Sequence, residues 1–441
     1  MQSFAREPDF LRVLSDGTVK QLNPFTGTEV WTVPARSHRP TGAVAREARP
    51  IDPAAHGRHC ALCEARYLET PPEKSRLTLV DGEWEQHDHT PANQLFDSVA
   101  EFRRVPNLFE ILSFDYWHSN YGFELPPWIR DRREAYLAEP AGLRHVLDVV
   151  RAKLRAAGKQ PEEVRALGTE ELLEHASGFF GGGHDVVIAR RHFVDGATDE
   201  SQLASSGSLT REEHEQFVRF TVDSVRRLYD VNRYVRYVAV FQNWLRPAGA
   251  SFDHLHKQLV AIDERGAQHE AALTRLRADP NVFNDVGANF AAMRNLYIAE
   301  NAHAIAFAGF GHRYPTIEVY SKSEHSNPWE HDPEEVAGVS DMLHAMQAAT
   351  GPDIACNEEW HYRPIDVVTP MPWRIMLKWR ISTLAGFEGA TKIYLNTLAP
   401  DTIRDRVVAA LLTLRGIGHI AWDLRIGSEV EPRPNPLRYG R

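Results

Sequence analysis

Three alternating polar residues, His254, His256 and Gln258, lead directly into the apolar run 259–262. Residues two apart in a β-strand point to the same side of the sheet. The pattern therefore predicts a strand at 258–262, with the three polar side chains on one face as the chain enters it. Buried polar groups need partners, and an isolated His-x-His is most often a strand edge with hydrogen-bonded histidines. The stretch becomes a candidate site only if other residues support it.

The chain has 441 residues, a length that suits two domains or one duplicated unit. In the first half, a helix opened by the capping box of Thr210 and Glu213 precedes the strands. A similar order of strands and helices recurs in the second half, which predicts two related α+β units. Apolar residues at helical spacing within 129–178 predict helices there. The predicted strands are 186–188, 234–242, 258–262, 304–307, 317–320, 375–377 and 392–396, and the later helices are 333–349 and 401–415.

Composition excludes several classes of protein. No apolar run reaches 18 residues, so we expect no membrane span. The first residues lack the features of a signal peptide, and three cysteines make no disulfide framework, so we expect a cytoplasmic protein. A net charge of −10 argues against nucleic acid as a partner. A phosphorylated small molecule is compatible with it, since a few arginines bind phosphate.

Cys60 and Cys63 form a Cys-x-x-Cys pair, which suits half of a metal site or a redox pair. Two thiolates need two further ligands for a closed tetrahedral zinc site, and Cys356 stands alone. Histidines must complete such a site. The leading candidates are His192 and His254, and the spacing leaves His184 and His59 open as alternatives. A thiol oxidoreductase is disfavoured because the pair lacks a thioredoxin-like βαβ context.

The segment 241–258 (FQNWLRPAGASFDHLHKQ) resembles the active-site signature of the galactose-1-phosphate uridylyltransferase branch of the histidine-triad superfamily. Four other segments resemble that family and follow its order along nearly the whole chain. They are 23–40 (NPFTGTEVWTVPARSHRP), 60–73 (CALCEARYLETPPE), 103–109 (RRVPNLF) and 384–396 (LAGFEGATKIYLN). Each segment alone is weak evidence for the family, whereas the agreement of all of them, in the family's order, is specific.

The resemblance implies an α+β fold with two histidine-triad-like halves, each a mostly antiparallel sheet with helices packed on it. We assign them to residues 1–265 and 266–441, with a helical insertion at about 110–180. The family implies a nucleophilic histidine, His256, with Gln258 holding a non-bridging phosphate oxygen, and a homodimer. The implied structural zinc ligands are Cys60, Cys63, His192 and His254; the implied substrate-binding residues are Arg36, Arg39, Asn107, Asn243, Gly249, Ser251 and Glu388.

Gln258 bears on the type of reaction. An amide cannot donate a proton to a leaving group at neutral pH, whereas hydrolases of this superfamily carry a third histidine there. We therefore expect a nucleotidyltransferase that moves a nucleoside monophosphate from a nucleotide-sugar to a phosphorylated acceptor, a sugar 1-phosphate or phosphate, through a covalent nucleotidyl-histidine. The alternatives are a phosphorylase or hydrolase of nucleotide-sugars or dinucleoside polyphosphates, and a non-catalytic zinc-stabilised nucleotide-binding protein.

The chain also departs from the family pattern. Pro372 and Arg374 stand where the family often has a second His-x-His, which argues against a second metal site. Leu108 stands where a ribose-contacting aspartate is expected, which leaves the preferred nucleotide open.

Overall fold

The computed structural model describes residues 9–34 and 48–440. Its main element is a sheet of twelve strands in the order β16-β10-β11-β12-β14-β13-β8-β9-β7-β6-β4-β5, and every neighbouring pair is antiparallel. The α+β class with antiparallel sheets is thus confirmed. The strands are β4 (Ser75–Val80), β5 (Glu83–Asp88), β6 (Phe102–Pro106), β7 (His184–Ala189), β8 (Tyr237–Trp244), β9 (His256–Ile262), β10 (Tyr297–Glu300), β11 (Ala304–Ala308), β12 (Thr316–Ser321), β13 (Cys356–His361), β14 (Arg374–Trp379) and β16 (Arg425–Ile426).

The sheet consists of two halves with matching order. Three antiparallel strands, β4, β6 and β7, precede helix α7 (Arg211–Val231), which leads into β8 and β9. In the second half β10, β11 and β12 precede helix α10 (Pro333–Thr350), which leads into β13 and β14. The halves meet where β8 pairs with β13, so they share one continuous sheet. The boundary between residues 265 and 266 stays a prediction.

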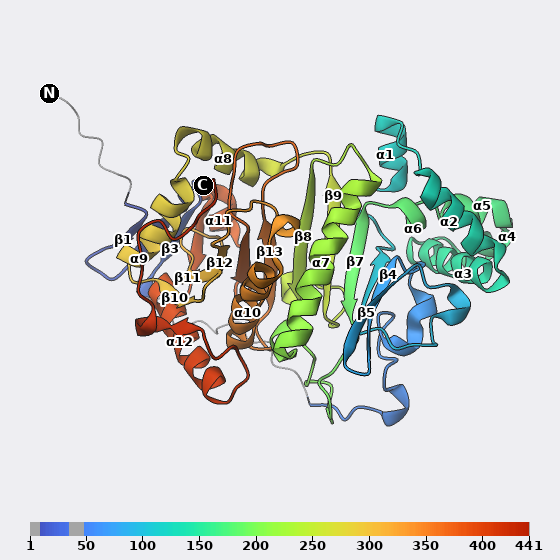
Figure 1. Cartoon of the computed structure of the whole chain (residues 1–441), viewed down its shortest axis with the longest axis horizontal. Helices are drawn as coiled ribbons and strands as arrows, with labels where there is room; N and C mark the ends of the chain where they lie inside the picture. Colours follow the sequence, from blue (N-terminus) through green and yellow to red (C-terminus); the bar gives the residue numbers. More distant parts are fainter. Residues whose placement is uncertain (1–8, 35–47, 441) are drawn as a thin grey trace.

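Helices α7 and α10 lie side by side across one face of this sheet, as Figure 1 shows. The apolar side of α7 is buried, including Phe217, Phe220, Val225 and Leu228, as its spacing predicts. The predicted capping box is present, because the Thr210 hydroxyl accepts from the Glu213 backbone N–H and the Glu213 carboxylate accepts from that of Thr210. Helix α12 (Pro400–Gly416) packs beside α10.

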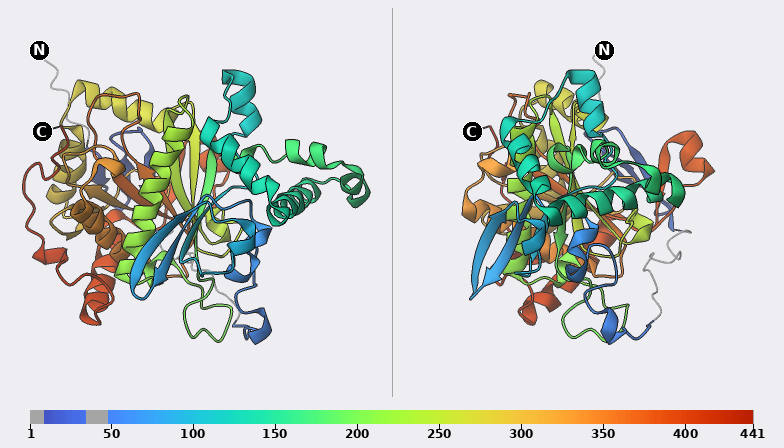
Figure 2. Two further views of the ribbon diagram at one scale, coloured as in Figure 1. Left: turned by 45° about the vertical axis from the view of Figure 1, so that its right-hand side comes forward. Right: turned by 90° about the vertical axis from the view of Figure 1, so that its right-hand side faces the viewer.

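The opposite face is covered unevenly. Over the second half lie a four-stranded sheet, helix α8 and the helical segment that follows it (Figures 1 and 2). The first half leaves part of its face open. The covering elements are β1 (Leu11–Val13), β2 (Val19–Leu22), β3 (Glu29–Thr32), β15 (Ile393–Asn396), α8 (Gly266–Ala278), a π-helix (Phe283–Asn289), α9 (Phe290–Met293) and α11 (Gly386–Thr391).

Residues 114–181 form six helices beside the sheet, at the right of Figure 1. They enclose a hydrophobic core of their own, in which Ile129, Val146 and Phe180 are buried. None of the helices in the described part of the chain has the length and hydrophobicity needed to cross a bilayer. The six helices are α1 (Phe114–Tyr121), α2 (Pro127–Ala138), α3 (Pro140–Ala156), α4 (Pro161–Ala166), α5 (Thr169–Glu174) and α6 (Gly178–Gly181).

Candidate active site and metal centre

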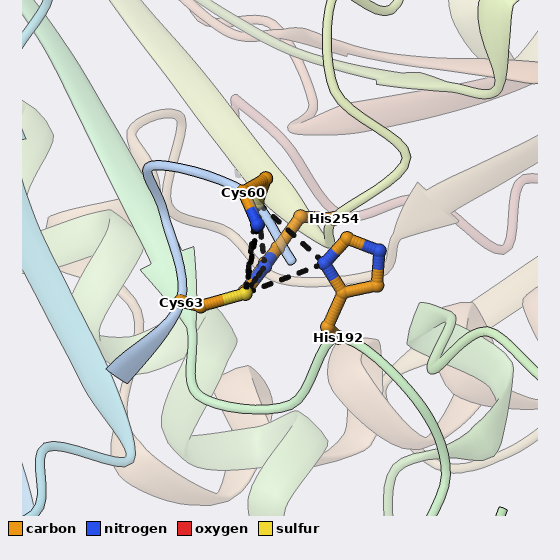
Figure 3. A group of neighbouring side chains, drawn as sticks. All are labelled: Cys60, Cys63, His192 and His254. Carbon is orange, nitrogen blue, oxygen red and sulfur yellow. Dashed lines mark hydrogen bonds between the residues drawn. The ribbon is translucent and has the colours of Figure 1, made fainter. Parts of the chain in front are cut away.

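Four ligand-type side chains from distant parts of the sequence converge at one end of β9 (Figure 3). The Cys60 and Cys63 sulfurs are 3.7 Å apart, and His192 Nδ1 lies 3.5 Å from each of them. His254 Nδ1 lies 3.5 Å from the Cys60 sulfur and 3.7 Å from that of Cys63. Loop 60–63 packs over β6 and β7 through Leu62, on the face of the sheet away from α7. The structure thus brings together all four predicted ligands.

These distances match the edges of a tetrahedral zinc site. With Zn–S bonds of about 2.3 Å and Zn–N bonds of about 2.0–2.1 Å, tetrahedral ligands lie about 3.5–3.8 Å apart. His254 Nε2 lies 2.6 Å from the Ala189 carbonyl oxygen, so Nε2 donates and Nδ1 is left as the ligand atom. Hydrogen bonds from Cys60, His192 and His254 hold the pKa of Cys63 well below the usual range of a thiol, which favours the thiolate. The donor set fits zinc.

His256 begins β9 and lies two residues beyond this cluster. Its Nδ1 is 2.7 Å from the His254 carbonyl oxygen, so Nδ1 carries the proton and Nε2 keeps its lone pair. Burial lowers the pKa of His256 to about 4. The imidazole is therefore neutral at pH 7, with Nε2 available as a nucleophile. His254 itself precedes the strand, so the predicted alternation on one face holds for His256 and Gln258 only.

Gln258 is oriented by a residue that the sequence offered only as an alternative metal ligand. The Ile111 backbone N–H donates to His184 Nδ1 over 3.2 Å, so His184 carries its proton on Nε2. That Nε2 lies 3.1 Å from Gln258 Oε1 and donates to it. Asn107 Nδ2 lies 3.1 Å from the same ring nitrogen and 3.5 Å from Gln258 Oε1. The carbonyl of Gln258 is thus engaged, which leaves its amide N–H groups for a ligand.

The role of His184 follows from the pairing of β7 with β9. His184 is the first residue of β7, and the register of β7 with β9 pairs Val186 with Gln258. Residues two apart on a strand share a face, so His184 and Gln258 point to the same side. That pairing becomes visible only once the neighbouring strands are known. His59, the other alternative ligand, lies outside the four-ligand cluster and packs edge-on against Phe193.

The remaining predicted substrate residues fall into three groups. Asn243 lies on β8, and Gly249 follows in the loop to β9, where a Cβ atom would lie 3.8 Å from Asn243 Nδ2. Ser251 is exposed in the same loop. Glu388 lies on α11, where its Oε2 accepts from the Ala385 N–H, so it caps its own helix. Arg36 and Arg39 lie outside the described residues.

Positions 372 and 374, where the family often has a second His-x-His, are packed into the protein. Arg374 is buried, and its guanidinium carbon lies 4.3 Å from the ring centre of Phe283 and 5.5 Å from that of Phe25. The second group of metal-ligand type among the described residues, His325, Asp332 and Glu335, lies elsewhere. Leu108 packs against the core of the helical insertion.

Known proteins share this architecture. An ADP-glucose phosphorylase from Arabidopsis thaliana is 22% identical over 394 residues, which cover 86% of this chain and 90% of that protein. The crystal structure of an ADP-glucose phosphorylase from Arabidopsis thaliana with bound ADP-glucose superposes with a TM-score of 0.55 at 18% identity, over 88% of this chain and 97% of that chain. The X-ray structure of a GalT-like protein from the same plant gives 0.54 at 17% identity, over 88% and 98%.

The fold is therefore that of these ADP-glucose phosphorylase and GalT-like structures, which confirms the resemblance. Residues 14–439 match the family described as "Domain of unknown function (DUF4921)". The chain belongs to that family.

Proposed function

We propose that this chain is an enzyme that transfers a nucleoside monophosphate from a nucleotide-sugar to a phosphorylated acceptor through His256. The observation that supports this most is the state of His256. It is buried and neutral, its Nδ1 donates to the His254 carbonyl, and its Nε2 has no hydrogen-bond partner among the described residues; Gln258 lies two residues on along β9, on the same face. A neutral imidazole is a good nucleophile near pH 7.

In the proposed first step, Nε2 attacks the α-phosphorus of the nucleotide-sugar. An N–P bond forms, the bond to the bridging oxygen breaks, and the sugar 1-phosphate leaves with the electron pair. In the second step a phosphate oxygen of the acceptor attacks the same phosphorus and releases His256. The Gln258 N–H groups donate to a non-bridging oxygen, where charge develops. Asn243, Gly249 and Ser251 contribute further donors, and Asn107, Arg36 and Arg39 bind the nucleotide.

We propose zinc as the ion held by Cys60, Cys63, His192 and His254. Its role is structural, since all four coordination positions are filled by the protein. The backbone of His254 continues directly into His256, and the carbonyl of His254 is the group that accepts from His256 Nδ1. Zinc bound there would hold the His254 backbone in place, and the His254 carbonyl sets the tautomer of the proposed nucleophile.

Inorganic phosphate is the second candidate acceptor, and a specific observation favours it. The relative that shares 22% identity over most of both chains is named ADP-glucose phosphorylase. A phosphorylase would use the same covalent step and differ only in the acceptor.

A homodimer and a cytoplasmic location complete the proposal. Light scattering coupled to size-exclusion chromatography tests the dimer.

The decisive experiment is intact-mass spectrometry after brief mixing with UDP-glucose, ADP-glucose, GDP-mannose or a dinucleoside tetraphosphate. We expect an acid-labile adduct with the mass of UMP, AMP or GMP, which names the base. The His256→Ala variant should form none. Adduct decay on adding glucose 1-phosphate or inorganic phosphate then distinguishes transferase from phosphorylase. A wild-type protein that forms no adduct and releases no sugar phosphate with any donor contradicts the proposal.

A further inference from the structure

A cavity of about 450 Å³ opens on the uncovered face of the sheet, where β8 and β13 join the two halves. Phe241 pairs with Gln258 on β9, and Asn243 pairs with Asn357 on β13. Continuing the first register by two residues places Asn243 opposite His256. Since neighbouring strands lie about 4.8 Å apart, this cavity begins within about 10 Å of the nucleophile. Its size suits a small-molecule site.

Arg380 lines this cavity and is a cation without an acidic partner in residues 9–34 and 48–440. Its Nη1 donates to Asn357 Oδ1 over 2.8 Å, and its guanidinium carbon lies 4.6 Å from the ring centre of Tyr314. Its Nε is buried and has no acceptor. A buried donor left without an acceptor is costly, and a guanidinium fork matches the oxygens of a phosphate. Arg380 is thus prepared for an anionic ligand.

Asn357 connects Arg380 to the proposed nucleotide site. Its Nδ2 donates to Asn243 Oδ1 over 2.7 Å and to the Ala248 carbonyl over 2.8 Å. The carbonyl of Asn243 is therefore engaged, and its amide N–H groups are free for a phosphate beside His256. A hydrogen-bonded path thus runs from Arg380 through Asn357 to Asn243, which the strand register places opposite the proposed nucleophile.

The same cavity offers partners for hydroxyl groups. His361 is buried, and in the described part of the chain neither of its ring nitrogens makes a hydrogen bond, while its Nε2 lies 3.7 Å from Glu359 Oε2. A neutral imidazole has one donor and one acceptor, and each hydroxyl of a sugar needs both. Glu359 lies on the same face, and Lys378 holds its carboxylate through a contact of 2.6 Å. A ligand with one phosphate and several hydroxyls satisfies these groups together.

We propose that this cavity is the subsite for the phosphate monoester that leaves in the first step and accepts in the second. Arg380 binds its phosphate, and Glu359 and His361 bind sugar hydroxyls when a sugar is attached. This assignment rests on the proposed nucleotidyl transfer. It commits to a phosphate monoester or to inorganic phosphate, which share the contact with Arg380, and the acceptor arms of the experiment distinguish them.

The test compares two donors that share the nucleotide and differ in the leaving group. A nucleotide-sugar releases a sugar phosphate, whereas a nucleoside phosphorimidazolide releases imidazole and needs no phosphate subsite. For Arg380→Ala we expect adduct formation from the nucleotide-sugar to slow by at least about tenfold. Formation from the phosphorimidazolide should stay unchanged. Decay of the adduct with glucose 1-phosphate or with inorganic phosphate should slow to a similar degree, and only the true acceptor discharges the wild-type adduct quickly.

Arg313→Ala is the matched control, because Arg313 is exposed and its guanidinium stacks on the same Tyr314 ring. It should behave as the wild type. If Arg380→Ala fails to fold, Arg380→Lys keeps the charge and loses the fork, and it should slow the nucleotide-sugar reaction alone. Equal effects on both donors, or an effect on neither, overturn the subsite. A wild-type protein that forms no adduct from either donor overturns the proposed function instead.

Discussion

Strands β9 and β14 occupy equivalent places in the two halves, but their first residues have different environments. His256 begins β9 and Arg374 begins β14, each on the face away from α7 and α10. His254, two residues before His256, joins the four-ligand cluster, whereas Pro372 offers no ligand atom at the matching position. The equivalent strand end thus carries the four-ligand cluster and the proposed nucleophile in one half, and a packed arginine in the other.

The difference lies as much in the covering elements as in the strands. Phe25, Phe283 and Tyr320 surround Arg374, so its face of the sheet is closed by packing. Over the first half, the loop of Cys60 and Cys63 covers β6 and β7 and leaves the cavity beside β8 open. A duplicated fold can therefore keep the ligand cluster and the proposed nucleophile in one half by closing the equivalent position in the other.

The largest expected effect separates His256 from Arg374. We expect His256→Ala to reduce turnover by at least about 10³-fold, because no other group replaces the nucleophile. Arg374→Met, at the equivalent position, should leave adduct formation within about twofold and lower the free energy of unfolding by about 0.5–3 kcal/mol. Adduct mass spectrometry and urea denaturation measure the two effects. A loss of adduct formation in a folded Arg374→Met protein would show that Arg374 takes part in the reaction and does not serve packing alone.

Metal removal should affect the first half only. Since structural zinc contributes directly to folding, Cys63→Ser or strong chelation should cost several kcal/mol and release the loop at 60–63. Elemental analysis should find one zinc per chain in the wild type and none in the variant. Cys356→Ser serves as the control, because Cys356 is buried on β13 away from the cluster. Full stability and activity in a metal-free protein would exclude a structural ion.

Local patterns in the sequence were sufficient for many of the elements, and the resemblance supplied the four proposed metal ligands. The capping box at Thr210, the apolar side of α7 and the apolar runs of β7 and β9 are set by neighbouring residues, so their positions were predictable. The four ligands followed from a Cys pair and the resemblance, and the structure brings them together.

Pairing across the sheet was not predictable from the same patterns. The apolar runs of β8 and β13 do not indicate that these two strands pair. The joining of the two halves and the pairing of Asn243 with Asn357 are therefore known only from the structure. No local sequence pattern marked His184, Asn357 or Arg380, because their contacts depend on which strands pair. For Glu388 the structure adds a hydrogen bond from the Ala385 N–H to Oε2, and the predicted substrate contact of this residue stays a prediction.

A smaller effect tests the hydrogen bond that orients Gln258. His184→Phe removes the donor to Gln258 Oε1, so the amide can rotate, and we expect kcat to fall by about 3- to 10-fold with a smaller change in KM. A double-mutant cycle distinguishes this from general damage. On a Gln258→Ala background, His184→Phe should have little further effect. Additive losses in the cycle would assign His184 a purely structural role.

The smallest expected effect concerns a histidine of the second half that serves packing. His344 on α10 is fully buried, its Nε2 donates to the Leu209 carbonyl over 2.8 Å, and its Nδ1 has no partner. Burial lowers the pKa of His344 to about 4, with His419 and Arg211 adding to the effect. The ring of His214 on α7 lies 5.1 Å from that of His344, tilted by 47°, and burial holds the pKa of His214 low as well.

Because the unfolded chain binds a proton on His344 near pH 6.5 and the folded chain does not until about pH 4, stability falls as the pH is lowered between these values. The loss attributable to one such histidine approaches about 1.4 kcal/mol per pH unit. We expect His344→Gln to make the decline between about pH 6.5 and pH 4.5 shallower in urea denaturation, whereas the exposed control His175→Gln should leave it unchanged. An identical decline in all three proteins would mean that His344 is already protonated in the folded state, and that the second half of the molecule is less tightly closed than its packing indicates.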